Sequence, residues 1–480
     1  MDPLDELRAA TALYGYGLRI GCPSGDGAPD IFVDPERSLL AIGPPRSGKT
    51  SALVVPNVLA ACGPVVTTST KPDVVLITSP ARSRVGRCML FDPGGSTRDV
   101  PGVERISWSP LSTAIEFHGA ELMARTMVEA ARPGARQGES THWLERAETL
   151  LAPAFHAAAI DGMPMSRLLS AIDRRQGEDF RAILARHDRE VPLSSLDGIL
   201  ATEDREQSGI WSTGSSILSA YRSERALEST AGRTVDFEEL VRSGDTLYIC
   251  SPSEEQRRAA PIVCGLLRDV RAAAYDASAA GELGAANRRP PLLLLLDEVA
   301  NIAPLHDLPD LVATGGSQGV VTLACLQDLS QAVERWGRIG EGFLGMFNAK
   351  VIFPGVGCVR TLEEVSRLAG EHEVTTVSTS EGHRLPGLAG ALGRRTPPAR
   401  TWSTRRERVL PVEHVAQGWP GHVVCLEGAR PSLVEARPWF QVPRLARVVE
   451  QSRTPERSYI ESPRPPISRA ERAGSRPLSR

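Results

Sequence analysis

The octapeptide GPPRSGKT at residues 43–50 restricts the fold of this chain more than any other feature. Its spacing, G-x-x-x-x-G-K-T, is the full phosphate-loop pattern, which requires a strand that ends at the loop and a helix that begins from it. Residues 38–43 form an apolar run typical of that strand, and residues 49–61 are predicted as the helix, with Pro56 disturbing its second or third turn. The pattern predicts a phosphate-binding α/β fold.

Each position of the loop has a role in holding a triphosphate. Glycines let the backbone curl, so that successive N–H groups and the positive end of the following helix converge on the phosphates. The Lys49 ammonium would reach the terminal phosphates, and the Thr50 hydroxyl would bind Mg²⁺. A glycine-rich hairpin without a ligand is the alternative, which the flanking strand and helix disfavour. The residues predicted to bind the nucleotide are Gly43, Pro45, Arg46, Ser47, Gly48, Lys49, Thr50 and Ser51.

A second motif, PPLLLLLDEVAN at residues 290–301, indicates hydrolysis rather than binding alone. Five consecutive leucines are typical of a parallel strand buried on both faces. Asp297 and Glu298 follow it, at the edge where open α/β sheets place their ligands. An acidic pair there divides two tasks, since the Asp orients the Mg²⁺ shell and the Glu accepts a proton from the attacking water. An apolar helix that ends in a solvated acidic pair is the alternative.

Composition indicates a globular protein of roughly two or three domains, with 480 residues, 41% hydrophobic and 24% charged. The net charge of −3 means that any nucleic-acid-binding surface would be local. No stretch approaches the 18 or so apolar residues needed to span a bilayer, and the amino terminus is acidic, unlike a secretory signal. The predicted location is cytoplasmic, or peripheral at the cytoplasmic face of the inner membrane through a partner.

The eight cysteines are dispersed, without a C-x-x-C pair, and several lie inside apolar runs. This pattern indicates buried thiols in a reducing compartment rather than metal ligands or disulfides. They are Cys22, Cys62, Cys88, Cys250, Cys264, Cys325, Cys358 and Cys425.

The order of predicted elements divides the chain into five segments. Strands alternate with helices after the phosphate loop, then only helical periodicity is found, and strands return from about residue 245. The predicted segments are an N-terminal segment (1–30), a first part of the nucleotide-binding domain (31–112), an inserted all-α domain (113–231), a second part of the nucleotide-binding domain (232–447) and a disordered Arg/Pro/Ser-rich tail (448–480).

Two stretches are predicted as a solvated loop and a disordered tail, namely residues 378–408 and the chain from about residue 451. Both are rich in Gly, Pro, Ser and Arg and poor in core-forming residues. Both also carry local positive charge, so contact with phosphates is the alternative interpretation.

Several segments together resemble the coupling-protein ATPases of conjugative type IV secretion, the TraG/TraD type, especially actinobacterial forms. The resemblance covers roughly residues 35 to 445 and rests on GPPRSGKTSALVVPN, TTSTKPDVV, LFDP, WSPL, LLLLLDEVANIAPL, LACLQDLSQ and RPWF. It implies a RecA-like P-loop NTPase with a mostly parallel sheet and an inserted all-α domain. It also implies ATP and Mg²⁺ as cofactors and a homo-hexameric ring. The implied partners are DNA, a relaxase or other secretion substrate, and a type IV secretion channel or membrane-anchor protein.

The resemblance also assigns roles to single residues. It places Lys49 and Thr50 on the nucleotide and the metal, Asp297 on the metal, and Glu298 in catalysis. Gln327, at the end of the neighbouring strand, would hydrogen-bond the γ-phosphate or the attacking water. A polar strand cap is the alternative role for this glutamine.

Two features depart from the family pattern. Family members usually carry amino-terminal transmembrane helices, which this sequence lacks, so membrane attachment would come from another polypeptide. Many relatives also have an arginine where Gly316 stands, reaching into the ATP site of the next subunit. Such an arginine finger contributes a factor of about 10³ to 10⁵ in rate. Arg338, Arg360 and Arg405 are the candidates to replace it.

Three functions fit these observations. The first is an ATP-hydrolysing coupling protein that recruits or pumps a relaxase–DNA complex to a conjugation channel. The second is a nucleotide-dependent recruitment adaptor with weak ATPase activity, which Gly316 favours and the acidic pair disfavours. The third is a DNA translocase of the FtsK/HerA type without a role in secretion, against which the TTSTKPD and RPWF segments count.

Overall fold

The computed structural model describes residues 2–22, 29–131, 139–232, 234–252, 254–284, 289–380 and 399–453. A ten-stranded sheet forms its centre, in the order β14-β13-β10-β3-β9-β8-β4-β7-β5-β6. Only β13 and β14 run antiparallel to their neighbours. The strands are β3 (Leu39–Ile42), β4 (Val65–Ser69), β5 (Cys88–Phe91), β6 (Glu104–Arg105), β7 (Thr246–Cys250), β8 (Leu292–Leu296), β9 (Val320–Leu326), β10 (Ala349–Ile352), β13 (His422–Glu427) and β14 (Arg430–Glu435). The predicted α/β fold with a mostly parallel sheet is confirmed.

The leucine run shows why these sequences form central strands. In β8, Leu292, Leu294 and Leu296 face one hydrophobic core, whereas Leu293 and Leu295 face a second core on the other side of the sheet. Because both faces of a parallel strand are covered by helices, an uninterrupted apolar run is stable there. The sheet therefore separates two cores.

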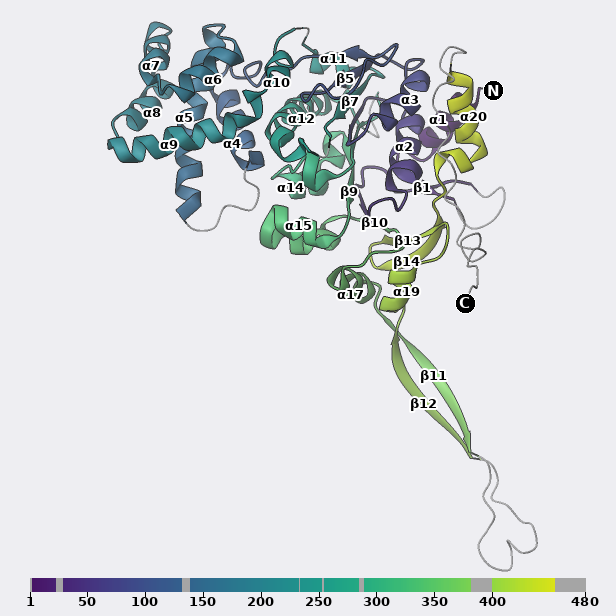
Figure 1. The fold of residues 1–480 in the computed structure, drawn as a ribbon. Coiled ribbons are helices and arrows are strands. Elements are labelled where there is room, and N and C mark those ends of the chain that lie inside the picture. The colour runs from purple at the N-terminus through teal and green to yellow at the C-terminus, as the bar shows by residue number, and fades with distance from the viewer. Residues whose placement is uncertain are drawn as a thin grey trace, which may run out of the picture.

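One face of the sheet is covered by four helices, of which three lie within the first 82 residues and one lies near the end of the described chain. They contact one another in the pairs α1–α2, α1–α20, α2–α3 and α3–α20, and Figure 1 shows them together near the N-terminus. Their bounds are α1 (Pro3–Leu13), α2 (Val55–Ala60), α3 (Asp73–Arg82) and α20 (Pro443–Ser452). The N-terminal segment also holds the small sheet of β1 (Arg19–Gly21) and β2 (Ile31–Phe32).

The opposite face packs against a second set of helices. The longest, α12 (Gln256–Ala279), contacts β9 and also α4 of the helical region. The others are α13 (Val299–Ile302), α14 (Leu308–Thr314), α15 (Leu329–Trp336) and α16 (Phe343–Met346).

Between β6 and β7 the described residues form helices and no strand, and most of these helices gather at one end of the molecule (Figure 1). The helix α4 attaches this region through its contacts with α12. The division into domains stays a prediction. The helices are α4 (Phe117–Ala131), α5 (Glu139–Ile160), α6 (Met165–Asp173), α7 (Gly177–Arg186), α8 (Glu190–Leu200), α9 (Asp204–Ile217), α10 (Glu224–Glu228) and α11 (Phe237–Arg242).

A two-stranded ribbon projects from the body of the protein, as Figure 1 shows. It consists of β11 (Glu371–Ser380) and β12 (Ala399–Arg408), paired antiparallel over their whole length, with α17 (Val359–Leu368) and α19 (Val412–Gln417) at its base. The prediction of a solvated loop over residues 378–408 was wrong at both ends. The Gly- and Pro-rich centre, residues 381–398, dominates the composition of that stretch and lies outside the described residues.

The other predictions have mixed outcomes. The helix α20 runs to Ser452, and its Val448 and Val449 are buried, so the predicted tail begins too early. The residues from 454 onward lie outside the described part of the chain. All eight cysteines are free thiols, five of them buried, as predicted. Among the described residues, no helix is both long and apolar enough to span a membrane.

Candidate nucleotide-binding site

The phosphate loop begins where β3 ends and curls tightly. A Cβ atom on Gly43 would lie 2.6 Å from Phe353 Cβ and 2.7 Å from Ser47 Oγ, so this position has no space for a side chain. Gly48 has φ +101° and Arg46 has φ +63°, both in the left-handed region. Glycine reaches this region without strain, which explains the second invariant position of the pattern.

The helix after the loop starts as a π-helical turn, Thr50–Val54, and continues as α2. The Val55 N–H donates to the Thr50 carbonyl, five residues back. Pro56 has no N–H and cannot give the regular bond four residues back, so the wider turn accommodates it. The prediction of a helix with an irregularity near Pro56 is confirmed, and the irregularity is a π turn.

Lys49 is buried, with 6% of its surface exposed. Its Nζ atom donates to the Gly43 carbonyl at 2.5 Å and to the Pro44 carbonyl at 3.1 Å. These bonds turn the ammonium back toward the start of the loop. The Lys49 ammonium is thus held inside the loop, next to the backbone whose N–H groups the pattern assigns to phosphates.

The two sequence motifs meet at Thr50 and Asp297. The Thr50 hydroxyl donates to Asp297 Oδ2 at 2.5 Å, although the residues are 247 positions apart. The contact follows from the sheet order, because β3 and β8 both flank β9 and run parallel to it, so their carboxyl ends share one edge. Burial raises the pKa of Asp297, and the Glu298 carboxylate adds to the rise, against the Thr50 hydrogen bond and the Lys49 charge.

The predicted catalytic residues also come together. Gln327, the first residue after β9, donates from Nε2 to Glu298 Oε2 at 3.2 Å and to Oε1 at 3.4 Å. Asn301 Nδ2 donates to Glu298 Oε2 at 3.3 Å. Glu298 itself has φ +53° at the start of α13. Two amide side chains thus fix the direction of one carboxylate beside the metal-binding candidates.

The phosphate loop contributes to two cavities. The first has a volume of about 720 Å³ and includes every loop residue from Arg46 to Ser51. The second has a volume of about 450 Å³ and includes Pro45 together with Glu298, Asn301 and Gln327. The remaining wall of the second cavity is formed by Thr70, Glu254, Gln256 and Arg257. All predicted loop residues except Gly43 therefore line one of the two cavities.

The first cavity has polar and apolar walls. The phosphate loop contributes Lys49 and Thr50, while α3 and the C-terminal part contribute the apolar Leu76, Ile77, Trp439 and Phe440 together with the charged Asp73, Glu450 and Arg453. Trp439 and Phe440 belong to that wall, with ring centroids 5.6 Å apart and planes nearly perpendicular. Small-molecule sites have volumes of roughly 300 to 1,000 Å³ and apolar walls with few polar groups. The cavity thus has the size and chemistry for a phosphorylated compound with a flat base.

The aromatic wall was not predicted, although the RPWF segment contributed to the resemblance. No local pattern assigns Trp439 or Phe440 to a site, because their partners on the phosphate loop are nearly 400 positions away in the sequence. The available signal was compositional: aromatic residues make up only 5% of the chain, and two of them are adjacent here.

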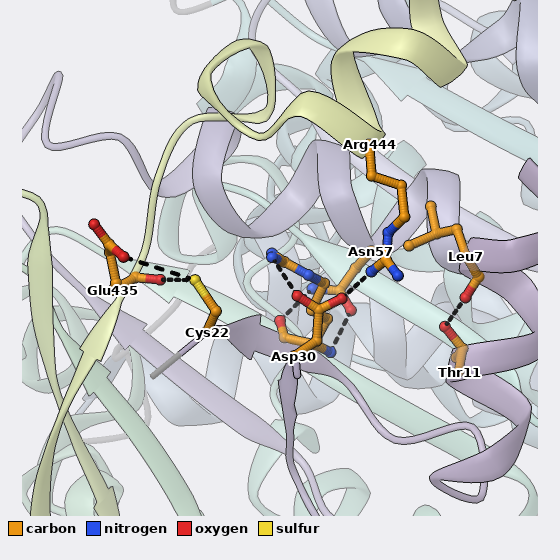
Figure 2. A network of polar contacts seen from close by, with 8 residues as sticks. Leu7, Thr11, Cys22, Asp30, Asn57, Glu435 and Arg444 are labelled. Atoms are coloured by element: carbon orange, nitrogen blue, oxygen red, sulfur yellow. Dashed lines mark hydrogen bonds and ion pairs between the residues drawn. The ribbon is translucent and has the colours of Figure 1, made fainter. Parts of the chain in front are cut away.

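A polar network, shown in Figure 2, joins the N-terminal segment to the chain on either side of the aromatic wall. Arg444, in the first turn of α20, pairs with Asp30, which also binds Arg19 Nη2 at 2.9 Å. The backbone of Arg19 is bonded on both sides to the side chain of Asn57 in α2, at 2.8 Å each. The backbone of Cys22 pairs with that of Glu435, just before the aromatic pair. The N-terminal segment therefore fixes both flanks of the wall.

The structure explains why position 316 holds glycine and not a larger residue. A Cβ atom there would lie 1.8 Å from the backbone oxygen of Glu36. Neither cavity, as the described residues line it, includes Arg338, Arg360 or Arg405. Arg360 is paired with Glu341 and Glu364, and Arg405 with Glu407. Arg257, which was not predicted, is the arginine that lines the second cavity.

Known proteins show the same architecture. Residues 291–417 match the family model TraG-D_C, described as the TraM recognition site of TraD and TraG. A conjugal transfer protein TraG of Escherichia coli is 24% identical over 385 residues, which are 74% of this chain and 58% of the relative. A second TraG from the same species is 23% identical and is covered to 59%. The resemblance to conjugative coupling proteins is confirmed.

Solved structures of the bacterial conjugative coupling protein TrwB share this fold. An unbound form has a TM-score of 0.65 at 16% identity, covering 88% of this chain and 92% of TrwB. TrwB in complex with ADP and Mg²⁺ has a TM-score of 0.62 at 18% identity, covering 84% and 85%. TrwB in complex with the non-hydrolysable ATP analogue ADPNP has a TM-score of 0.62 at 17% identity, covering 84% and 86%. The fold is the RecA-like fold of P-loop NTPases. The chain spans less than two thirds of the TraG relatives.

Proposed function

We propose that this protein binds ATP with Mg²⁺ across the phosphate loop and hydrolyses it as a coupling protein of conjugative DNA transfer. The observation that carries the proposal is the contact between Thr50 and Asp297, with Glu298 and Gln327 beside it. It joins a complete phosphate loop to an acidic pair from a strand far away in the sequence. The nucleotide complexes of TrwB and the names of the TraG relatives support it.

The side chains have distinct tasks in this proposal. Thr50 Oγ1 and the Asp297 carboxylate are oxygen ligands of the kind that Mg²⁺ prefers, and the bound ion would neutralise phosphate charge. The Lys49 ammonium exchanges its carbonyl partners for terminal phosphate oxygens. The Glu298 carboxylate accepts a proton from the attacking water, and the amides of Gln327 and Asn301 keep that carboxylate directed into the second cavity.

The first cavity would hold the sugar and the base. The ring of Phe440, which is 38% exposed beside the buried Trp439, offers a stacking surface, and α3 supplies Leu76 and Ile77 as apolar contacts. These apolar contacts make no base-specific hydrogen bonds. The wall would therefore favour a purine for its large flat surface rather than for its hydrogen-bonding groups. The same nucleotide then spans both cavities, with the loop beneath its phosphates.

The proposed partners follow from the relatives. They are DNA, a relaxase or other secretion substrate, and a type IV secretion channel or a membrane-anchor protein at the cytoplasmic face of the inner membrane. A ring of six copies is the proposed assembly. The family described as the TraM recognition site covers the C-terminal part of this chain and supports a protein partner there.

A second function, a nucleotide-dependent recruitment adaptor, is favoured by one observation. The position of the family's arginine finger is closed by the Glu36 backbone, so an arginine cannot stand at Gly316 in this conformation. Without an equivalent cation, hydrolysis would lack a contribution of about 10³ to 10⁵ in rate. The adaptor would still bind ATP and change its partners with the bound nucleotide.

ATP binding and turnover of the purified protein, with and without single- and double-stranded DNA, separate these functions. Lys49→Ala is expected to remove ATP binding and turnover, whereas Lys71→Ala, at an exposed lysine outside both cavities, serves as the matched control. Turnover stimulated by DNA supports the motor. Tight ATP binding with turnover near background supports the adaptor. Unchanged ATP affinity in Lys49→Ala would contradict both.

A further inference from the structure

The β11–β12 ribbon carries local positive charge, whereas the chain as a whole has a small negative net charge. In its outer part, the six facing pairs formed by residues 374–379 and 400–405, there are two arginines and no Asp or Glu. The other side chains there are Ser, Thr and Val, with a single Trp. The chain as a whole has a net charge of −3. The outer part of the ribbon is therefore locally basic, whereas its base holds Arg406 and Arg408 together with Glu371, Glu373 and Glu407.

The register of the ribbon places its largest apolar side chain beside an arginine. Trp402 lies directly opposite Val377, and the next pair outward on the same face is Thr379 with Arg400. Trp402 is 68% exposed and Val377 is 46% exposed, so the pair is not covered by the body of the protein. An exposed indole, with an arginine and hydroxyl residues as its neighbours in the ladder, is thus carried by the ribbon, whose projection from the body Figure 1 shows.

The chemistry of this face distinguishes between possible occupants. The cores of protein interfaces hold several apolar side chains, whereas this face has one exposed apolar pair among hydroxyl groups and arginines. Arg, Ser and Thr side chains are frequent donors to phosphate oxygens, and aromatic rings stack on unpaired bases of single strands. Arg405 is held by Glu407, and Arg406 lies opposite Glu373, so Arg400 is the arginine farthest from acidic groups of the ribbon.

We infer that the β11–β12 ribbon is a binding arm for single-stranded nucleic acid, in which Trp402 stacks on a base and Arg400 contacts the backbone. The inference rests on the proposed function for its role in DNA transfer and adds the surface that receives the strand. Binding to the arm itself requires no ATP hydrolysis. The arm lies outside both cavities, so the two activities can be measured separately.

The test is fluorescence anisotropy of a labelled 20-nucleotide single strand with the full chain at several salt concentrations. Trp402→Ala and Trp402→Val are expected to weaken binding about tenfold, since one stacked base is lost. Trp402→Val retains a β-branched partner for Val377 and thereby separates stacking from ribbon stability. Trp402→Phe keeps a ring and most of the affinity. Leu13→Ala, at another exposed apolar side chain, is the control.

Arg400→Gln tests the electrostatic part. The slope of log affinity against log salt should fall by about 0.7 for the loss of one single-strand phosphate contact. The inference would be overturned if Trp402→Ala and Arg400→Gln bound single strands as tightly as the parent, or if the parent bound no single strand. It would also be overturned if the variants changed only the oligomeric state or the binding of a protein partner. ATP turnover without DNA should stay at the parent level in every ribbon variant, so absent turnover would count against the proposed function alone.

Discussion

The two cavities beside the phosphate loop differ in how the chain builds them. The second cavity is polar, and its Glu298 and Gln327 lie within two residues of the ends of adjacent parallel strands. The first cavity is half apolar, and its aromatic wall comes from the C-terminal part, held by the N-terminal segment. The residues proposed for hydrolysis are thus fixed by the sheet itself, whereas those proposed to contact the base are fixed by packing between the N-terminal and C-terminal parts of the chain. The difference predicts that the two cavities control different kinetic parameters.

The largest effect is expected in the polar cavity. Glu298→Gln keeps the side-chain shape and removes the proton acceptor, so turnover at saturating ATP should fall by roughly 10² to 10⁴. The dissociation constant for ATP should change little, because the loop contacts remain. Steady-state turnover and equilibrium ATP binding measure the two quantities. A tenfold or greater loss of affinity would show that this carboxylate mainly holds the nucleotide.

A smaller effect of the opposite kind is expected in the apolar cavity. Phe440→Leu retains an apolar side chain in this wall but removes the exposed flat ring, so the dissociation constant for ATP should rise roughly 10-fold. Turnover at saturating ATP should stay within about twofold of the parent. Inorganic tripolyphosphate, which has no base, is the internal control and should bind the variant and the parent equally. Equal weakening of both ligands would place the defect in the loop.

Gly316 lies in neither cavity, so its substitution should change stability instead of either kinetic parameter. Gly316→Ala introduces a Cβ against the Glu36 oxygen and should lower the free energy of unfolding by about 1 to 3 kcal/mol. Gly345→Ala is the matched control, since nothing lies within 4 Å of its Cβ position. Chemical denaturation measures both. A Gly316→Ala protein as stable as the parent would mean that the Glu36 loop moves away easily.

Asp297→Asn should have the smallest effect on the fold. Burial raises the pKa of Asp297, so the ionised carboxylate is disfavoured in the folded state. The protonated form therefore favours folding at low pH, and this contribution to stability is lost as the pH rises from the ordinary carboxyl pKa through the raised pKa of the folded state. Asparagine removes this loss and can still accept the Thr50 hydrogen bond. The melting temperature without nucleotide at neutral pH should not fall, while stabilisation by ATP should no longer depend on Mg²⁺. A clear fall in the melting temperature would contradict this interpretation.

The polar cavity could be predicted because its residues occupy fixed places in local motifs. A leucine run that ends in Asp297 and Glu298 must place them at the carboxyl end of a buried strand, and the phosphate loop lies at the same edge. Gln327 follows the strand between them for the same reason. Parallel topology thus converted separate motifs into one site.

The apolar cavity and the ribbon could not be predicted in this way. Trp439 lines the same cavity as the phosphate loop because α20 packs on α1 and α3. The sequence contains no local pattern that predicts this packing. In the ribbon, the ladder between residues 371–380 and 399–408 depends on pairing across a long connection whose composition favours a loop. Long-range pairing, rather than local propensity, decided both regions.

The most direct test of the account measures ATP affinity and saturating turnover side by side in Glu298→Gln and Phe440→Leu. If one nucleotide spans both cavities, Glu298→Gln loses turnover at nearly unchanged affinity, and Phe440→Leu loses affinity at nearly unchanged turnover. If both variants lose the same parameter, or if neither differs from the parent, the division of the site into a hydrolytic and a base-binding cavity is contradicted.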